Sequence, residues 1–380
     1  MHIKRSHYMM SVAISAVTIL ILNHSAILGL IPTSKEKPIT SNQLIDLNLD
    51  SNIPVKSELD TVMLEATLTE SENIPLLHSL IIAQHDEILV EKYLNGGNGV
   101  QPVNIKSASK VIMSALTGIA VEKGFIKSID QKVVEFLPQY FNENTDLLKR
   151  EITIRHLLYM ASGLSSTSSD NYPGWVASSN WVKNALDRPM VYMPGETMLY
   201  STGDSHILSA ILSVATGMST YEFAQKYLFK PMDITIGGWD HDPQGIYFGG
   251  NNLAMSPLDL MKFGLTYLNQ GYYQGKEVIP SPWVQESTNK HIETTASFRD
   301  FDYGYYWWLY TFGGQHVYFA WGYGGQFIYV IPDLDSVVVF TSSTDLRPRD
   351  GGHLEHIQEL LEFYIIPMLE MKDAPTLAGN

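Results

Sequence analysis

The chain has 380 residues, of which 45% are hydrophobic and 17% charged, so it can bury a sizeable core and is not disordered over most of its length. It carries 25 Lys and Arg against 40 Asp and Glu, a formal net charge of -15, which argues against a nucleic-acid binder because such a protein needs a basic face. It contains no cysteine, which excludes disulfides, thiolate metal sites and a cysteine nucleophile.

The N-terminus has the pattern of an export signal. Lys4 and Arg5 precede an apolar run from Met9 to Leu22, which resembles a signal-peptide core. Residues 9–31 together could just span a bilayer, so a cleaved signal peptide and an uncleaved membrane anchor over residues 1–31 both remain open. We therefore expect an exported protein, either periplasmic or anchored in the membrane and facing outward. The polar residues 32–73 predict a linker or lead-in, and residues 74–380 predict the folded domain.

The remaining pattern predicts helices and strands in an order that defines the fold class. Two short β runs around a polar turn predict a hairpin over residues 80–90. Apolar spacings of three and four predict helices over residues 107–123, 131–137, 154–160, 205–215, 220–228, 257–269 and 353–368. Aromatic and β-branched residues predict strands over residues 303–310, 317–321, 326–331 and 336–341. This order favours an α+β fold, with an antiparallel sheet built from both ends of the chain, flanking terminal helices and a mainly helical subdomain beside a cleft.

Ser107 and Lys110 form a Ser-x-x-Lys pair at the start of a predicted helix. Residues three apart lie on one face of a helix, so the lysine amine can reach the serine hydroxyl. A serine needs a base in this position to act as a nucleophile, and a lysine serves if its pKa is lowered. The same spacing occurs at residues 34–37 and 287–290, but only Ser107 precedes an apolar helix. The alternative is a helix-capping serine with a solvated lysine.

Two further segments carry a family resemblance. The Pro194-Gly195 turn is followed by Tyr200-Ser201-Thr202 and a helix, and Gly322 lies in a Gly-rich turn before a strand. With Ser107 and Lys110, these segments resemble the serine β-lactamase and penicillin-recognising superfamily over roughly residues 75–370. The resemblance is closest to the class C β-lactamase-like branch, which includes esterases and 6-aminohexanoate-dimer hydrolases.

The resemblance implies a β-lactamase-like fold and a role for each matched position. Tyr200 would be the general base and acid, its pKa lowered by Lys110, and Thr202 takes the place of a substrate-binding Asn. The N–H groups of Ser107 and Tyr323 would form the oxyanion hole. The candidate substrate-binding residues are Thr202, Trp175, Trp321 and Gly322, with the two tryptophans lining an apolar acyl pocket. Ala320 and Trp321 replace the family's Lys or His and its Thr, so the basic residue that holds a substrate carboxylate is absent.

These residues predict a serine hydrolase that acts on a small-molecule ester or amide through an acyl-enzyme on Ser107. The mechanism requires neither a metal nor an organic cofactor. A β-lactamase or D-alanyl-D-alanine peptidase remains an alternative, with Arg347 or Arg349 holding the substrate carboxylate. A non-catalytic binding protein on the same fold is the second alternative.

Overall fold

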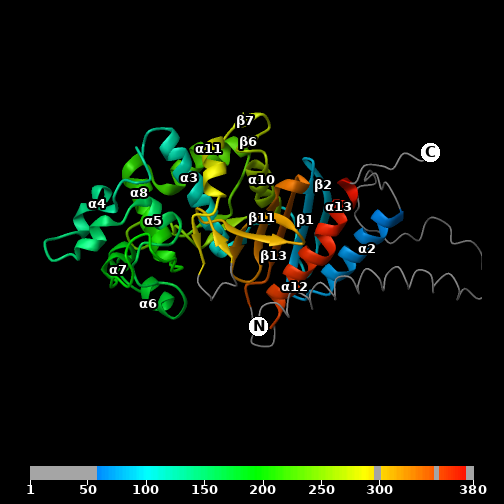
Figure 1. Ribbon diagram of the computed structural model, residues 1–380, viewed down its shortest axis with the longest axis horizontal. Coiled ribbons are helices and arrows are strands. Elements are labelled where there is room, and N and C mark those ends of the chain that lie inside the picture. The colour runs from blue at the N-terminus through cyan, green and yellow to red at the C-terminus, as the bar shows by residue number, and fades with distance from the viewer. Residues whose placement is uncertain (1–57, 295–300, 346–350, 374–380) are drawn as a thin grey trace, which may run out of the picture. The chain divides into compact units, whose positions relative to one another are not determined.

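The computed structural model describes residues 58–294, 301–345 and 351–373, and its core is an eight-stranded antiparallel sheet (Figure 1). The strand order is β2-β1-β13-β12-β11-β10-β9-β8. The strands are β1 (Leu77–Gln84), β2 (Glu87–Tyr93), β8 (Ile292–Glu293), β9 (Asp302–Tyr303), β10 (Trp308–Phe312), β11 (Gln315–Gly322), β12 (Gln326–Ile331) and β13 (Ser336–Ser342). Every residue of β12 and β13 is buried, because helices cover both faces of the sheet.

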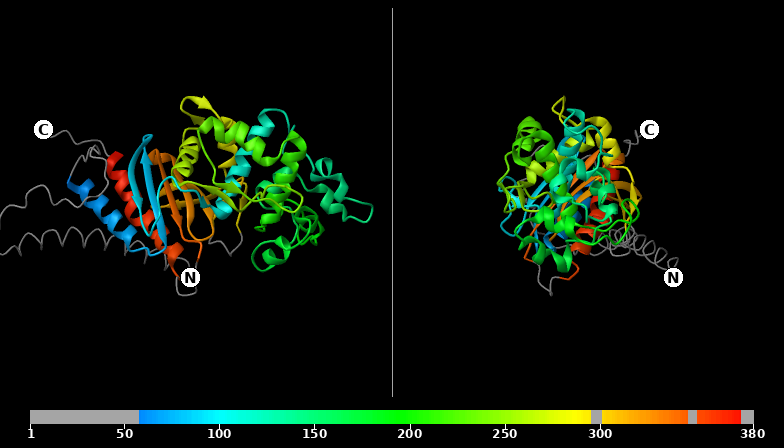
Figure 2. Two further views of the ribbon diagram at one scale, coloured as in Figure 1. Left: turned by 180° about the vertical axis from the view of Figure 1, so that it is seen from behind. Right: turned by 90° about the vertical axis from the view of Figure 1, so that its left-hand side faces the viewer.

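Helices from the two ends of the described chain pack together on one side of the sheet. They are α2 (Glu58–Glu72), α12 (His353–Leu360) and α13 (Ile366–Asp373), and Figure 2 shows them beside β1 and β2. Leu64 and Leu68 of α2 are buried there. The sequence predicted a linker up to residue 73, whereas the chain is helical and packed from residue 58.

The other side of the sheet is covered by α10 (Pro257–Leu268), next to which lie α3 (Lys110–Glu122) and α11 (Ser281–Ser287). Beyond them is the helical subdomain, made of α4 (Val133–Phe136), α5 (Ile154–Leu158), α6 (Tyr172–Val176), α7 (Trp181–Asp187), α8 (Thr202–Thr216) and α9 (Thr220–Ala224). The first eleven residues of α8 are buried, so this helix forms the centre of the subdomain.

Two small sheets complete the described fold. The first has the order β3-β5-β4, and the second is a hairpin of β6 and β7. Their strands are β3 (Val103–Asn104), β4 (Gly238–Trp239), β5 (Leu253–Met255), β6 (Tyr272–Tyr273) and β7 (Lys276–Glu277). In the described ranges no single helix is long and apolar enough to cross a membrane. The two segments Thr202–Thr216 and Thr220–Met232 reach the required length and apolar composition only when taken together, and the chain bends by 75° between them.

The predicted elements are largely confirmed, with local differences that have physical causes. The predicted strand over residues 303–310 is split into β9 and β10, because Tyr306 adopts a positive φ of 68° and turns the chain between them. The helix predicted from residue 107 begins as a 3-10 turn, Lys106–Ser109, before α3. Its predicted end is confirmed at Gly124, which has a φ of 72°.

Candidate active site

Ser107 lies where the sheet, α3 and α8 come together. It is part of the 3-10 turn Lys106–Ser109, which contacts β11, while α3 contacts α8 (Figure 1). A 3-10 turn has about three residues per turn, so residues three apart are aligned along its axis. Accordingly the Nζ of Lys110, the first residue of α3, donates a hydrogen bond to Ser107 Oγ at 3.0 Å. The structure thus brings together the two residues that the Ser-x-x-Lys spacing predicts.

The amine of Lys110 is buried and surrounded by neutral oxygen atoms. The residue is 1% exposed, and besides Ser107 its Nζ donates to the carbonyl oxygen of Gly250 at 2.8 Å and to Thr202 Oγ1 at 3.5 Å. Removal from water disfavours the charged form, so burial lowers the pKa of Lys110 to about 7. At neutral pH a substantial fraction of this amine is therefore uncharged and able to accept a proton.

Tyr200 reaches the same place from the segment that precedes α8. Its ring lies with its centroid 5.0 Å from Lys110 Nζ and stacks on Trp308 at 5.9 Å. Burial raises the pKa of Tyr200 to about 12, and a hydrogen bond with the Ser107 side chain lowers it only in part. The family resemblance implied a tyrosine with a lowered pKa, whereas the structure makes Lys110 the group whose pKa is closer to neutrality.

A loop of hydroxyl-bearing residues holds the segment that carries Tyr200 and Thr202. Ser168 Oγ accepts a hydrogen bond from Thr202 N at 2.9 Å and lies 3.0 Å from Thr202 Oγ1. Ser166 Oγ donates to the carbonyl oxygen of Tyr200 at 2.7 Å. Sequence reasoning missed these serines, although their run from Ser165 to Ser169 is visible in the chain.

The end of β11 presses against the turn that carries Ser107. A Cβ atom at Gly322 would lie 2.2 Å from Ile105 O and 3.2 Å from Ala108 N, so only glycine fits this approach. The following residues, Tyr323-Gly324-Gly325, form the turn into β12, and both glycines have positive φ values. Tyr323 directly follows Gly322 in the chain, and its side chain is 57% exposed.

Ala320 stands where the resemblance places the family's basic residue, and Trp321 was expected to line the acyl pocket. Ala320 is buried within β11 and brings no charge to the site. Trp321 is half-buried and stacks on Phe327 at 5.9 Å, with Trp308 at 5.4 Å edge-on. Arg347 and Arg349, the alternative cations, lie outside the residues that the structure describes.

Trp175 differs from the expectation that it lines an acyl pocket from a loop. It lies on α6, is 1% exposed, and donates from Nε1 to the carbonyl oxygen of Trp181 at 2.9 Å. Its ring packs 5.8 Å from the ring of His206. A side chain so enclosed stabilises the helical subdomain and has almost no surface to offer a substrate.

A backbone carbonyl at the site and a buried carboxyl group on α8 were not found from the sequence. Gly250 supplies the carbonyl oxygen that binds Lys110, yet the two residues are 140 positions apart and no local pattern connects them. Asp204 is 1% exposed on the first turn of α8, where burial raises its pKa to about 7 against the hydrogen bonds from Ser162 and Ser201.

The chain is similar to known proteins in sequence and in fold. The family model described as Beta-lactamase matches residues 78–362. An uncharacterized protein from Alkalihalophilus pseudofirmus is 19% identical over 349 residues, which cover 82% of this chain and 97% of that protein.

Several solved structures share the fold at low sequence identity. EstCE1, described as a hydrolase with promiscuous acyltransferase activity, has a TM-score of 0.67 and 16% identity, covering 80% of this chain and all 100% of its own. A D-stereospecific amidohydrolase from Streptomyces sp. has a TM-score of 0.60 and 18% identity, covering 73% of this chain and 93% of its own. A penicillin-binding protein from Bacillus halodurans has a TM-score of 0.60 and 17% identity, covering 77% of this chain and 98% of its own.

Proposed function

Because this chain belongs to the Beta-lactamase family, we propose that it is a serine hydrolase that cleaves ester or amide bonds through an acyl-enzyme on Ser107. The observation that carries the proposal is the 3.0 Å hydrogen bond between Ser107 Oγ and the buried amine of Lys110. A serine hydroxyl becomes an effective nucleophile when a base with a pKa near the working pH lies within hydrogen-bond reach. Lys110 meets both conditions.

In the proposed reaction the uncharged amine of Lys110 accepts the proton of Ser107 while Oγ attacks the substrate carbonyl carbon. The carbonyl oxygen becomes an oxyanion, which the N–H groups of Ser107 and Tyr323 would stabilise. The Lys110 ammonium then returns the proton to the leaving alcohol or amine as the bond to the carbonyl carbon breaks. A water molecule attacks the acyl-enzyme in the same way, releasing the acid and restoring Ser107.

Tyr200 has a supporting role in this scheme. Its neutral hydroxyl hydrogen-bonds to Ser107, and with a pKa of about 12 it retains its proton at neutral pH. A neutral phenol can donate to the oxygen that develops charge without itself being the base. Lys110 is therefore the proposed proton acceptor, and Tyr200 the group that orients Ser107 and the leaving oxygen.

The wall of the site favours substrates without an anionic group. Ala320 supplies no cation for a carboxylate, and Trp321 adds an aromatic surface. Apolar and aromatic walls gain free energy by burying apolar acyl groups. We therefore propose neutral esters or amides in preference to a penicillin or a D-alanyl-D-alanine peptide.

The test is hydrolysis of p-nitrophenyl butyrate by the full chain beside its Ser107→Ala variant, with a chromogenic cephalosporin in parallel. Ester turnover that is lost in the variant supports the proposal. Cephalosporin turnover that depends on Ser107 favours the β-lactamase alternative. Ester turnover that survives in Ser107→Ala contradicts the assigned nucleophile, and ligand binding without any turnover favours a binding protein.

We also propose that the protein functions outside the cytoplasm. The support is the basic and then apolar pattern of residues 1–31. N-terminal sequencing of the protein from separated cell fractions distinguishes a cleaved signal peptide, an intact membrane anchor and a cytoplasmic location, and the last result contradicts the proposal.

A further inference from the structure

A fully buried histidine–aspartate contact lies in the helical subdomain and takes no part in the proposed proton transfers. His206 Nε2 is 3.0 Å from Asp242 Oδ2, and both side chains are 0% exposed. His206 is on α8, and Asp242 is in the connection between β4 and β5. Burying such a pair costs free energy of desolvation. A protein in which apolar residues of similar size replace the pair is therefore often as stable or more stable. Its presence therefore points to a role in fixing one particular arrangement.

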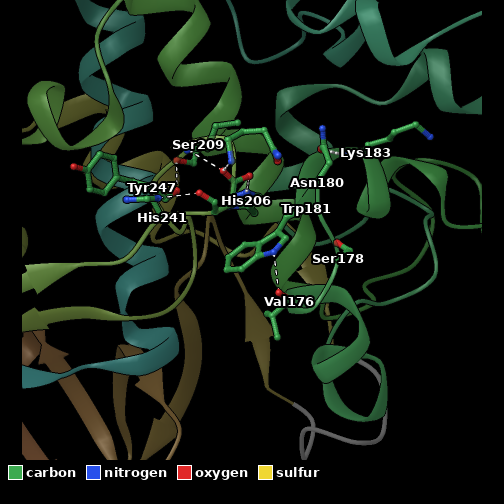
Figure 3. Close-up of polar contacts among 12 residues, drawn as sticks. Val176, Ser178, Asn180, Trp181, Lys183, His206, Ser209, His241 and Tyr247 are labelled. Carbon is green, nitrogen blue, oxygen red and sulfur yellow. Dashed lines mark hydrogen bonds and ion pairs between the residues drawn. The ribbon is translucent and has the colours of Figure 1, made fainter.

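The arrangement that the pair fixes is the path of the loop after β4. Asp242 Oδ1 accepts hydrogen bonds from the backbone N–H groups of Gln244 at 2.8 Å and Ile246 at 2.9 Å. On α8, Ser209 Oγ donates to the carbonyl oxygen of Tyr247 at 2.6 Å. Figure 3 shows His206 and Ser209 on this helix with the loop beside them. Two side chains of one helix thus attach residues 242–247 to α8.

The next residues of the same loop make the contact with Lys110. A Cβ atom at Gly249 would lie 1.9 Å from Ser205 O, which shows how closely the loop packs on α8. At Gly250 a Cβ atom would lie 2.8 Å from Lys110 Nζ, and the Gly250 carbonyl oxygen accepts from that atom at 2.8 Å. No side chain separates the loop from the amine, so a displacement of the loop reaches Lys110 directly.

Aromatic rings enclose His206 on its other sides. The ring centroids of Trp181, Trp175 and Phe248 lie 5.3, 5.8 and 5.9 Å from that of His206. Such close packing restricts the imidazole to few rotamers. Burial lowers the pKa of His206, although its bond to Asp242 opposes this. Although burial raises the pKa of Asp242, the hydrogen bonds from His206 and from the backbone N–H groups of Ile246 and Gln244 lower it, so Asp242 is a carboxylate that accepts Nε2–H from the neutral imidazole.

We propose that His206 and Asp242 are positioning residues, which hold the Gly250 carbonyl against Lys110 and keep water away from its amine. This inference rests on the proposed function, because it matters to the reaction only if Lys110 activates Ser107. The titratable groups on the elements around the amine are Tyr200, whose ring centroid lies 5.0 Å from it, Asp204 and His206 on α8, and Asp240, His241, Asp242 and Tyr247 on the loop. Within the described residues, none of these carboxylates contacts Lys110 Nζ.

The experiment compares the full chain with its His206→Gln and Asp242→Asn variants. The measurements are kcat and KM for p-nitrophenyl butyrate across acid to alkaline pH, and the rate at which a fluorophosphonate labels Ser107. We expect kcat to fall roughly 10- to 100-fold, the range that small misplacements of catalytic groups produce, with a smaller change in KM. The acid limb of the pH–rate profile, where the rate rises with pH, should move to higher pH. The reason is that water reaching the Lys110 amine removes the burial that lowers its pKa. The labelling rate should fall in parallel.

Gln84→Leu is the matched control. Gln84 is 2% exposed and donates to Leu334 O and Leu369 O, so the variant also loses buried hydrogen bonds. Gln84 pairs with Ser336 at the end of the sheet opposite to Gln326 and the β11–β12 turn. The control should lose stability and keep the wild-type kcat and acid limb.

Folded His206→Gln and Asp242→Asn variants with wild-type kcat and acid limb would overturn the inference. If neither variant folds, Ser209→Ala decides, since it removes the second attachment of the loop, together with a hydrogen bond to Thr220 Oγ1, and leaves His206 and Asp242 in place. It should shift the limb in the same direction to a smaller extent, and an unchanged limb contradicts the proposal. The failure of the proposed function is recognised separately, because Ser107→Ala would then retain turnover and labelling.

Discussion

Lys110 is the residue whose ionisation should control the rate of the proposed reaction. Below its pKa of about 7 the amine carries a proton and cannot accept another from Ser107. The rate of ester hydrolysis should therefore rise with pH and level off above about 7. Lys110→Arg keeps a positive charge that does not titrate in this range, so kcat should fall by roughly 10²- to 10⁴-fold, the usual contribution of a general base. A pH–rate profile of both proteins checks this, and an arginine variant with near wild-type activity would exclude Lys110 as the base.

Tyr200 should matter less than Lys110. With a pKa of about 12 its hydroxyl is neutral at working pH and acts through a hydrogen bond. Tyr200→Phe preserves the stacking on Trp308 and removes only that hydroxyl. A fall of roughly 10-fold in kcat is expected, as for loss of one hydrogen bond to a developing charge. If Tyr200→Phe costs more than Lys110→Arg, the roles of the two residues are reversed.

Asp204 should make the stability of the protein depend on pH. Burial raises its folded pKa to about 7 from an ordinary value of 3.8, so the folded state retains the proton more tightly than the unfolded chain. The stability that this group contributes is fully present below its unfolded pKa and is lost as the pH rises through its folded pKa. Asp204→Asn has a neutral amide in the same shape and should lack this loss.

Urea unfolding of both proteins at pH of about 5 and about 8 measures the effect of Asp204. A single group of this kind changes the free energy of unfolding by up to roughly 1.4 kcal/mol per pH unit. The wild type should therefore lose more stability than Asp204→Asn between the two values. Equal losses would show that Asp204 is ionised in the folded protein.

The residues of the site differ in how far the sequence could predict them. Ser107 and Lys110 are near neighbours, so their spacing, together with the apolar helix that follows, predicted the contact between the two side chains. Gly250 is distant in sequence, and its contribution is a backbone carbonyl that no residue pattern encodes. Trp175 was expected in a loop that lines the acyl pocket, but it lies buried on a short helix. A tryptophan in a polar segment gives no indication of which face of such a helix will be buried.

At the scale of elements, the close contact between β11 and the Ser107 turn should tolerate no added atom. A Cβ atom at Gly322 would lie 2.2 Å from Ile105 O, so Gly322→Ala must displace either the strand end or the nucleophile turn. We expect a fall in kcat of roughly 100-fold, because about 1 Å of misplacement has that effect. Gly238→Ala is the control, since a Cβ atom at that exposed strand position meets nothing within 4 Å.

Circular dichroism and urea unfolding establish whether the Gly322 variant remains folded, and ester hydrolysis gives its kcat. A folded Gly322→Ala protein with full activity would show that the strand end can move away without disturbing Ser107. The Gly238→Ala protein should match the wild type in both measurements.

The elements themselves could be predicted where their pattern is long and periodic. Continuous β runs identified β1, β12 and β13, because these strands are almost completely buried. The strand β2 was identified by the polar turn that joins it to β1, since only Val90 of this strand is buried. The aromatic run over residues 303–310 suggested one strand, but the turn at Tyr306 depends on packing that a run of aromatic residues does not reveal. Helix α2 was missed because its apolar residues are sparse and find their partners on α13 and the sheet, near the other end of the chain.

At the scale of the whole molecule, the formal charge of -15 should influence substrate selection. A negative field lowers the local concentration of anionic substrates, and salt screens it over about 10 Å at 0.1 M. Hydrolysis of a p-nitrophenyl monoester of a dicarboxylic acid should therefore show a lower kcat/KM than p-nitrophenyl butyrate. Added salt should narrow the difference, and a difference that salt leaves unchanged would assign the discrimination to the walls of the site alone.

The family and the α+β fold could be predicted because three short motifs occur in the expected order. The helical subdomain was harder to predict in detail, since its central helix α8 buries several polar residues whose partners lie on distant loops. The pair His206–Asp242 is an example, as neither residue is notable by itself in the sequence.

The pairing of β1 with β13 also has a consequence for how the protein is made. Ser79 on β1 and Thr341 on β13 share a buried hydrogen bond at 2.7 Å across 262 positions of the chain. Ribosomes deliver the chain from its N-terminus, so the β1–β2 hairpin emerges long before the strand that flanks it. Contacts between such distant segments slow folding, because a long loop must first be closed. The completed sheet, and with it the β11 end that supports Ser107, can therefore assemble only when translation is almost finished.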